Sequence, residues 1–241
     1  SRRIVVKVSL ISVTPEAMDV LLFTKATRLT MSPGLLDEIR VWPMEKKLAE
    51  LEYMANTIPS SWEFCDYTFL VEGVSRAYTH QQVRTRAASY AQQTMRVLDM
   101  GEFDYVYTPK VEEGYARSIV DHVLGEIKEA YQELIRSGVP PEDARGILPT
   151  NIATNIVCKF NLRTLAELAR SRTGGRTQGE YQSVINAMLD EALKVHPWAE
   201  TFFFPKSRDY FAEIEAFAKE HFPDLLTRGK LLKIVDKMRK G

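Results

Sequence analysis

Apolar and polar positions along the chain follow two different periods. The segment 4–13 is rich in Val and Ile and alternates in part, which predicts a β-strand. The segments 67–71 and 151–160 predict two more strands on the same grounds. Apolar residues recur at helical spacing over 112–136 and 180–195, which predicts the two longest amphipathic helices. The pattern predicts a mixture of helices with a modest sheet.

Shorter elements fill the remaining chain. Thr14 and Pro15 offer a helix start, with Thr14 as the N-cap. The segment 85–94 is polar and contains small residues, which is typical of a strand or a loop. No repeat, low-complexity tract or long linker interrupts the chain, so we expect a single domain over residues 1–241. Further short helices are predicted at 44–54, 75–84, 141–148, 162–170, 209–221 and 230–238.

Charge and composition narrow the functional classes. The 32 basic and 32 acidic side chains give a net charge of zero, which argues against a dedicated nucleic-acid-binding protein. No apolar run approaches the ~20 residues of a membrane span, and the first residues lack the long apolar run of a signal peptide, so we expect none. Cys65 and Cys158 fit no metal or disulfide pattern, so we expect a cytoplasmic protein. The four scattered histidines indicate no metal site.

Arginines in polar segments are the main chemical signal, because the Gly-rich phosphate loops and the G-x-S-x-G elbow are absent from the sequence. Arg84, Arg86 and Arg96 lie among short hydrogen-bonding residues in the segment 80–96. Guanidinium groups are suited to binding phosphate. Composition alone does not distinguish an anion-binding site from a solvated turn with surface arginines.

A second group of arginines lies between residues 144 and 180. Taken one at a time, most of them are explained more simply as structural residues than as ligand-binding ones. Arg170 and Arg172, for example, complement a helix C-terminus, which contributes under roughly 1 kcal/mol each. The group consists of Arg145, Arg163, Arg170, Arg172 and Arg176.

The order of these residues resembles the flavin-dependent thymidylate synthases, over roughly residues 60 to 200. The first block is Arg84-Thr85-Arg86-Ala87-Ala88-Ser89, followed by Gln92, Thr94 and Arg96. The later blocks are Ala144-Arg145-Gly146-Ile147-Leu148-Pro149, then Asn161-Leu162-Arg163, then Arg172 with Thr177-Gln178-Gly179-Glu180-Tyr181. Four blocks in order form a fairly specific signal.

Four positions depart from the pattern of the family. Thr85 replaces the central His of R-H-R, Gln92 replaces a Glu, and Thr94 replaces a Ser. Glu167 stands where the family has an Asn. Because Gln92 and Thr94 fall at positions that the family uses around the pyrimidine nucleotide, the resemblance supports the class of activity more strongly than the exact substrate.

The resemblance implies a fold, an assembly and a reaction. The fold is α+β, with mixed helices and a central antiparallel sheet. The assembly is a homotetramer whose sites lie at subunit junctions. The reaction is methylation of C5 of dUMP to give dTMP, with methylenetetrahydrofolate as the carbon donor, reduced FAD as the hydride source and NADPH as the reductant of the flavin. The flavin performs the redox chemistry, and the protein positions and polarises the reactants.

The resemblance also assigns roles to individual residues. Arg172 is the catalytic candidate, with an electrostatic role that favours negative charge on the ring as C5 becomes nucleophilic. The nucleotide site is implied at Gln81, Gln82, Arg84, Gln92, Gln93, Thr94, Met95, Arg96 and Arg145. The FAD site is implied at Ser60, Arg84, Thr85, Arg86, Asn161, Arg163 and Glu167.

Two other functions stay open at this point. The changes at Thr85, Gln92 and Thr94 fit a related flavin-dependent C5 methylase or hydroxymethylase acting on UMP or dCMP. The number of departures also fits a non-catalytic nucleotide-binding homologue. Against the latter, the arginines that would bind anions all persist.

Overall fold

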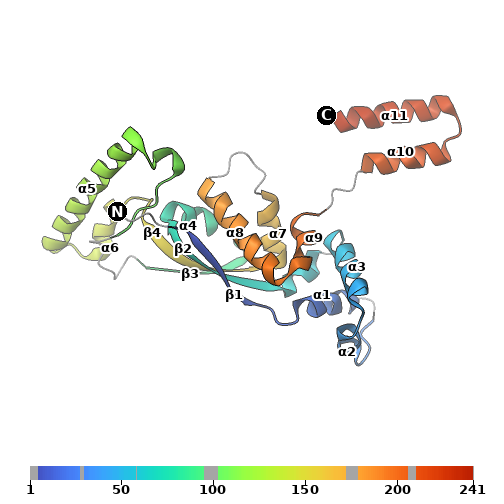
Figure 1. Ribbon diagram of the computed structural model, residues 1–241, viewed down its shortest axis with the longest axis horizontal. Coiled ribbons are helices and arrows are strands. Elements are labelled where there is room, and N and C mark those ends of the chain that lie inside the picture. Colours follow the sequence, from blue (N-terminus) through green and yellow to red (C-terminus); the bar gives the residue numbers. More distant parts are fainter. Residues whose placement is uncertain are drawn as a thin grey trace. The chain divides into compact units, whose positions relative to one another are not determined.

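A computed structural model describes residues 5–27, 30–57, 59–94, 103–171, 179–205 and 210–240 (Figure 1). The strands are β1 (Lys7–Val13), β2 (Asp66–Ser75), β3 (Ala88–Gln92) and β4 (Ala153–Asn161). The α-helices are α1 (Ala17–Ala26), α2 (Leu35–Arg40), α3 (Met44–Ala55), α4 (Arg76–Gln82), α5 (Gly114–Arg136), α6 (Pro141–Ala144), α7 (Leu162–Ser171), α8 (Gly179–Val195), α9 (Glu200–Phe203), α10 (Tyr210–His221) and α11 (Leu225–Lys240). Short 3₁₀ turns are η1 (Pro59–Phe64), η2 (Pro109–Val111), η3 (Arg145–Ile147) and η4 (Pro197–Ala199).

The chain divides into two compact units. The first unit, Ser1–Pro205, contains the sheet and helices α1 to α9, and the second, Lys206–Gly241, contains the α10–α11 hairpin. The expectation that residues 1–241 act as one functional domain stays a prediction. No described helix has the length and apolar character needed to cross a membrane.

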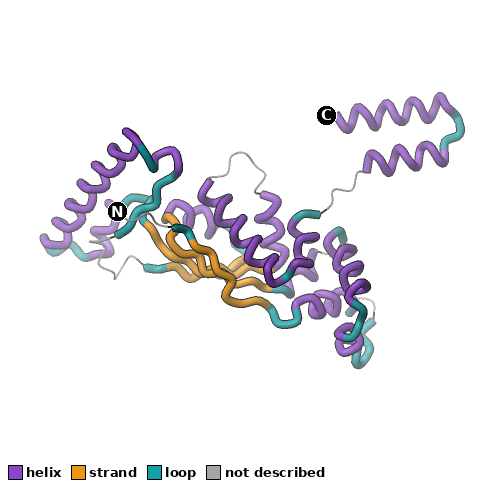
Figure 2. Tube along the Cα trace, viewed as in Figure 1, coloured by secondary structure: helices purple, strands orange, loops and turns teal. Residues whose placement is uncertain are grey.

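Four antiparallel strands form the sheet, in the order β1-β2-β4-β3 (Figure 2). The strands β2 and β4 are the central pair, and their register places Phe69 opposite Cys158. Two irregularities interrupt the ladders: one in β1 between Leu10 and Ser12, and one in β2 between Val71 and Val74. The structure therefore confirms the mixture of helices with an antiparallel sheet.

Helices cover one face of this sheet. Along β4, Thr154, Ile156, Cys158 and Phe160 are buried, and Asn155 between them is exposed. This alternation is the period-2 pattern of a strand with one face in the core. Helices α4, α7 and α8 pack against the strands, and all three lie on the same side of the sheet in Figure 1. The side chains of α4 and α7 are therefore carried by helices that pack against the sheet.

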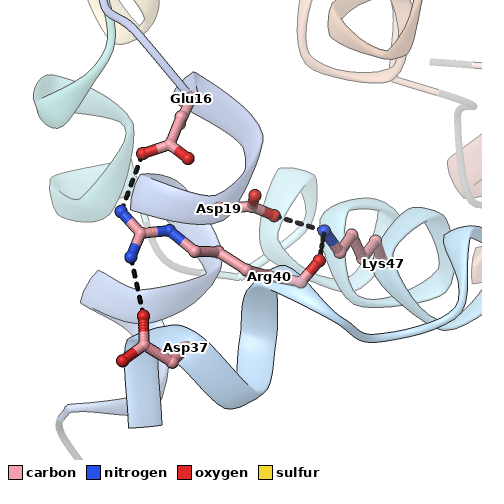
Figure 3. A network of polar contacts seen from close by, with 5 residues as sticks. All are labelled: Glu16, Asp19, Asp37, Arg40 and Lys47. Atoms are coloured by element: carbon pink, nitrogen blue, oxygen red, sulfur yellow. Dashed lines mark hydrogen bonds and ion pairs between the residues drawn. The ribbon is translucent and has the colours of Figure 1, made fainter. Parts of the chain in front are cut away.

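A polar network joins α1, α2 and α3 at one end of the first unit (Figure 3). The Lys47 ammonium group is buried and donates to Asp19 Oδ1 at 2.6 Å and to the Arg40 carbonyl at 3.0 Å. The Arg40 guanidinium bridges Glu16 and Asp37, each at 2.8 Å, on the more exposed side. The Glu16 backbone adopts φ 50°, in the left-handed region. The network holds three short helices together around one buried cation.

Most element predictions are confirmed within a few residues, with one correction at the first helix. Thr14 does not cap α1, which begins at Ala17 after Glu16. The Thr14 hydroxyl instead accepts a hydrogen bond from the Asp66 backbone N–H at 2.8 Å, and so ties the end of β1 to the start of β2. The pairing of β1 with β2 extends to Val13 and keeps the following residues out of the helix. The short helices α2 and α9 were not predicted.

Candidate active site

Helix α4 begins at a capped and firmly held N-terminus. The hydroxyl of Ser75, the N-cap residue, accepts a hydrogen bond from the Tyr78 backbone N–H at 3.0 Å. The Glu180 carboxylate on α8 accepts hydrogen bonds from the Ser75 N–H at 2.8 Å and the Ser75 hydroxyl at 2.6 Å. The start of α4 is therefore fixed to both β2 and α8.

A buried polar network supports the turn after α4. Gln82 is fully buried, and its side-chain oxygen accepts from the Tyr78 hydroxyl at 3.0 Å. The Tyr90 hydroxyl lies 2.8 Å from the carbonyl oxygens of both Gln82 and Thr85, the two acceptors for its single proton. Burial raises the pKa of Tyr90 to about 12, so this phenol stays a hydrogen-bond donor near neutral pH. The network fixes the backbone on which Arg84 and Arg86 are carried.

The turn after α4 and one side of α7 line a cavity of about 530 Å³. Arg84 and Arg86 are exposed, and neither forms an ion pair with another described residue. Two unpaired guanidinium groups favour an anionic ligand, and phosphate oxygens suit them in geometry as well as charge. The lining consists of Gln81, Arg84, Thr85, Arg86, Ala87, Thr164, Glu167, Leu168, Ser171 and Tyr181.

Helix α7 carries an arginine that pairs with carboxylates on η1 and on α7 itself. Asn161 caps this helix, because its side-chain oxygen accepts from the Thr164 N–H at 2.9 Å. Arg163 Nη1 lies 2.7 Å from Glu63, and its Nε lies 3.3 Å from Glu167. These carboxylates raise the pKa of Arg163, with Glu63 the larger influence. Glu167 therefore faces the cavity while partly neutralising Arg163.

A second cationic group forms at the other end of α4. The Arg76 backbone N–H donates to the Ile152 carbonyl at 3.0 Å, and Ala77 N–H donates to the Thr150 carbonyl at 2.8 Å. Arg76 Nη2 donates to the Gln93 carbonyl at 2.7 Å. Burial, and secondarily the positive charge of Arg145, lower the pKa of Arg76. The start of α4, the end of β3 and the segment after η3 therefore meet here.

The Arg76 guanidinium has an unused donor. Its Nε is buried and has no hydrogen-bond partner among the described residues. Neither Arg76 nor Arg145 forms an ion pair within the described part of the chain, although Arg145 Nε donates to the Glu142 carbonyl at 3.0 Å. A buried guanidinium donor without a partner, in the positive field of a second arginine, is typical of a site that an anion completes. The sequence prediction missed Arg76, because a single arginine at a helix start carries no distinctive pattern.

The predicted site residues separate into several locations. The cavity brings together five of them: Gln81, Arg84, Thr85, Arg86 and Glu167. Gln93 and Arg145 lie at the second cationic group, and Gln92 on β3 donates to the Thr79 hydroxyl on α4 at 2.8 Å.

Other predicted residues lie outside both locations. Gln82 and Asn161 have structural hydrogen bonds, and Ser60 and Thr94 are exposed outside the cavity lining. Met95, Arg96 and Arg172 lie outside the described residues.

The fold and the site define an α+β protein with two groups of arginines that form no ion pair among the described residues. The model of the thymidylate synthase complementing protein family, Thy1, matches residues 9–198. The chain belongs to this family, which confirms the resemblance found in the sequence. The match begins well before residue 60 and ends before the α10–α11 hairpin.

Several individual relatives are similar to this chain. A flavin-dependent thymidylate synthase of Clostridium tetani is 33% identical over 211 residues, covering 80% of this chain and 84% of the relative. One from Sulfurisphaera tokodaii is 41% identical over 132 residues, or 54% of this chain, and one from Sulfolobus acidocaldarius is 35% identical over 162 residues, or 67% of this chain. The chain spans about half of the S. tokodaii relative, at 51%, and 60% of the S. acidocaldarius relative.

Proposed function

We propose that this protein is a flavin-dependent thymidylate synthase that methylates C5 of dUMP to give dTMP. The observation that carries the proposal is the cavity at the end of α4, where Arg84 and Arg86 are unpaired among the described residues. They stand in the same order as in the family motif. The names of the relatives support the same reaction.

The residues around the cavity fit FAD as the cofactor. Arg84 and Arg86 offer charge-assisted hydrogen bonds to a pyrophosphate, and Thr85 offers a hydroxyl and a backbone amide. Leu168 and Tyr181 give part of the lining an apolar and aromatic character that suits a planar ring. Bound flavin would supply the two electrons that reduce the transferred one-carbon unit to a methyl group. Ser60, Asn161 and Arg163 lie outside this lining, so their contacts with FAD belong to the assembled oligomer in this proposal.

We place the nucleotide phosphate at the second cationic group. Arg145 and Gln93 were assigned to the nucleotide from the sequence, and Arg76 adds a guanidinium with an unused, buried donor. Arg76 and Arg145 would share the dianionic phosphate, and the Arg76–Gln93 hydrogen bond would fix the end of β3 beside it. Arg96 continues this segment in sequence and would add a third guanidinium.

Arg172 remains the proposed catalytic residue. Because arginine does not readily lose its proton, its role would be to stabilise negative charge on the pyrimidine ring while C5 attacks the methylene carbon. The C5 proton must then leave, and a hydride completes the methyl group. Arg172→Ala is expected to keep FAD but to lose nucleotide-dependent oxidation of the reduced flavin by about 10²–10³-fold. Full turnover by this variant would remove Arg172 from the mechanism.

The remaining parts of the proposal concern co-substrates and assembly. Methylenetetrahydrofolate would supply the carbon and NADPH would reduce the flavin. A homotetramer with shared sites would complete the ligand contacts that one chain leaves open, and a cytoplasmic location agrees with two buried, free cysteines.

The purified protein tests the proposal directly. Its visible spectrum is expected to be that of an oxidised flavin, bleached by NADPH, and dUMP with methylenetetrahydrofolate is expected to give dTMP by mass spectrometry. UMP and dCMP are the matched alternative substrates, because Gln92 and Thr94 depart from the family at nucleotide positions. Methylated or hydroxymethylated product from UMP or dCMP, but not from dUMP, would replace the proposed substrate. No product from any of the three would favour a non-catalytic binding protein.

A further inference from the structure

Only two apolar side chains are buried among the described residues of the second unit, Lys206–Gly241. Helices α10 and α11 pack as a hairpin (Figure 1), and the buried apolar residues between them are Ala218 and Val235. Compact units below about 40 residues usually need a disulfide, a metal or association with another chain. The sequence places no cysteine in this segment, and the described residues hold no metal-ligand cluster.

Both helices carry a second apolar surface that the hairpin leaves open. Ile214 and Phe217 on α10 are 40% and 55% exposed. Ile234 and Met238 on α11 are 55% and 62% exposed. We call these four side chains the open stripe. Exposed large apolar side chains that gather on one surface are typical of an interaction site.

The helical period places all four residues on one face of the hairpin. Ile214 and Phe217 precede the buried Ala218 by four and one positions, which is a rotation of about 40° to 100° back around α10. Ile234 and Met238 stand at −1 and +3 from the buried Val235, which is a rotation of about 60° to 100° in the same sense around α11. Because the two helices are antiparallel, equal rotations bring both halves of the open stripe to the same side.

Charges of opposite sign border the two edges of the open stripe. Glu213 and Glu220 follow its edge on α10, beyond Phe217. Lys230 and Lys237 follow its edge on α11, beyond Ile234. The whole helices differ in the same way, since α10 has three carboxylates against one lysine and α11 has six basic residues against one aspartate.

We propose that the open stripe binds the same stripe of a second copy of this chain. A two-fold axis parallel to the helices places α10 of one copy against α11 of the other, so that acidic edges face basic edges. All neighbouring helices are then antiparallel, as in a four-helix bundle. The other two-fold arrangement would set α10 against α10 and α11 against α11, with like charges opposed. The open stripe is therefore complementary to itself in one orientation only. The proposed contact does not depend on the proposed enzymatic function.

Cross-linking between full-length chains tests the contact. Cys65 and Cys158 are fully buried, so a short bismaleimide will react with an introduced surface cysteine. Chains carrying Ile214→Cys are mixed with chains carrying Met238→Cys. The proposed bundle predicts cross-linked pairs in the mixture, at least about tenfold above either variant alone, since α10 lies diagonal to α10 and α11 diagonal to α11. No excess in the mixture overturns the proposal, whether the hairpin packs on its own chain or on another molecule.

Charge reversal tests the orientation with the same cysteine pair. The acidic edge is reversed by Glu213→Lys with Glu220→Lys, and the basic edge by Lys230→Glu with Lys237→Glu. Each reversal in both mixed chains is expected to reduce cross-linking at least about tenfold, and one reversal in each chain is expected to restore it. The matched control, Lys219→Glu with Asp236→Lys, changes one charge per helix on the opposite face and is expected to leave cross-linking unchanged. Equal loss in the control, or no rescue on mixing, contradicts the proposed contact.

Discussion

Replacing Arg76 with Met should weaken binding of dUMP without weakening binding of deoxyuridine. Arg76 is anchored by its Nη2 bond to the Gln93 carbonyl, and its buried Nε has no described partner. In the proposed complex, this Nε and the charge of the side chain meet the phosphate. Methionine has a similar length, and it removes both the charge and the donors.

The expected magnitude follows from one charge-assisted hydrogen bond. Such a bond contributes about 1.5–3 kcal/mol, and about 1.4 kcal/mol corresponds to a tenfold change in affinity. Arg76 is partly exposed, which favours the lower half of this range, so we expect dUMP to bind about 10- to 40-fold more weakly. Arg76→Lys keeps the charge and loses the planar fork, and should have an intermediate effect.

Equilibrium dialysis of the flavin-loaded protein with labelled dUMP and deoxyuridine measures the effect. Arg136→Met is a suitable control, because Arg136 is an exposed arginine on α5 that is paired with Glu133. Thermal unfolding of each variant reports any cost of losing the Arg76–Gln93 bond. Equal weakening of both ligands, with the unfolding temperature unchanged, would refute a phosphate-specific role for Arg76.

Three further perturbations have defined outcomes. Glu167→Gln should tighten FAD binding by a few-fold at most in a flavin-fluorescence titration, because it removes a solvent-exposed negative charge from the cavity; weaker binding would indicate a direct contact with the cofactor. Lys47→Ala should lower the free energy of unfolding in urea by about 3–5 kcal/mol, because it leaves Asp19 without its buried partner, whereas Arg40→Ala on the exposed side should change it little. Burial lowers the pKa of His196 below its unfolded value, so the unfolded state binds more protons near pH 6.5 and stability is lost as pH falls below that value. His196→Gln should lose less stability than the natural protein between pH 7 and 5, and an identical loss would exclude His196 as a cause.

Periodicity in the sequence predicted the elements that the core fixes. The alternation of β4 and the stripe of α8 survive in the structure because both elements bury one face. The spacing of apolar residues predicted burial less well where some of those residues stay exposed. In α3, Leu51 is buried, but Leu48 and Tyr53 are 45% and 56% exposed. Thr14 illustrates a different limit, since its hydroxyl serves a contact with Asp66 that no local pattern could indicate.

The site was predicted as a motif, and the structure separates the motif into two kinds of residue. Arg84 and Arg86 present free charge to the cavity, whereas Gln82 and Asn161 hold the backbone that carries the site. Both kinds were assigned to the site from the same resemblance, so the sequence alone cannot distinguish a ligand-binding side chain from a structural one. Arg76 shows the converse, because its proposed role depends on a hydrogen bond to residue 93 and on the nearby charge of residue 145, which only folding supplies. A substitution at Gln82 is therefore expected to act through the fold of the α4 turn, and loss of activity there would not identify a ligand contact.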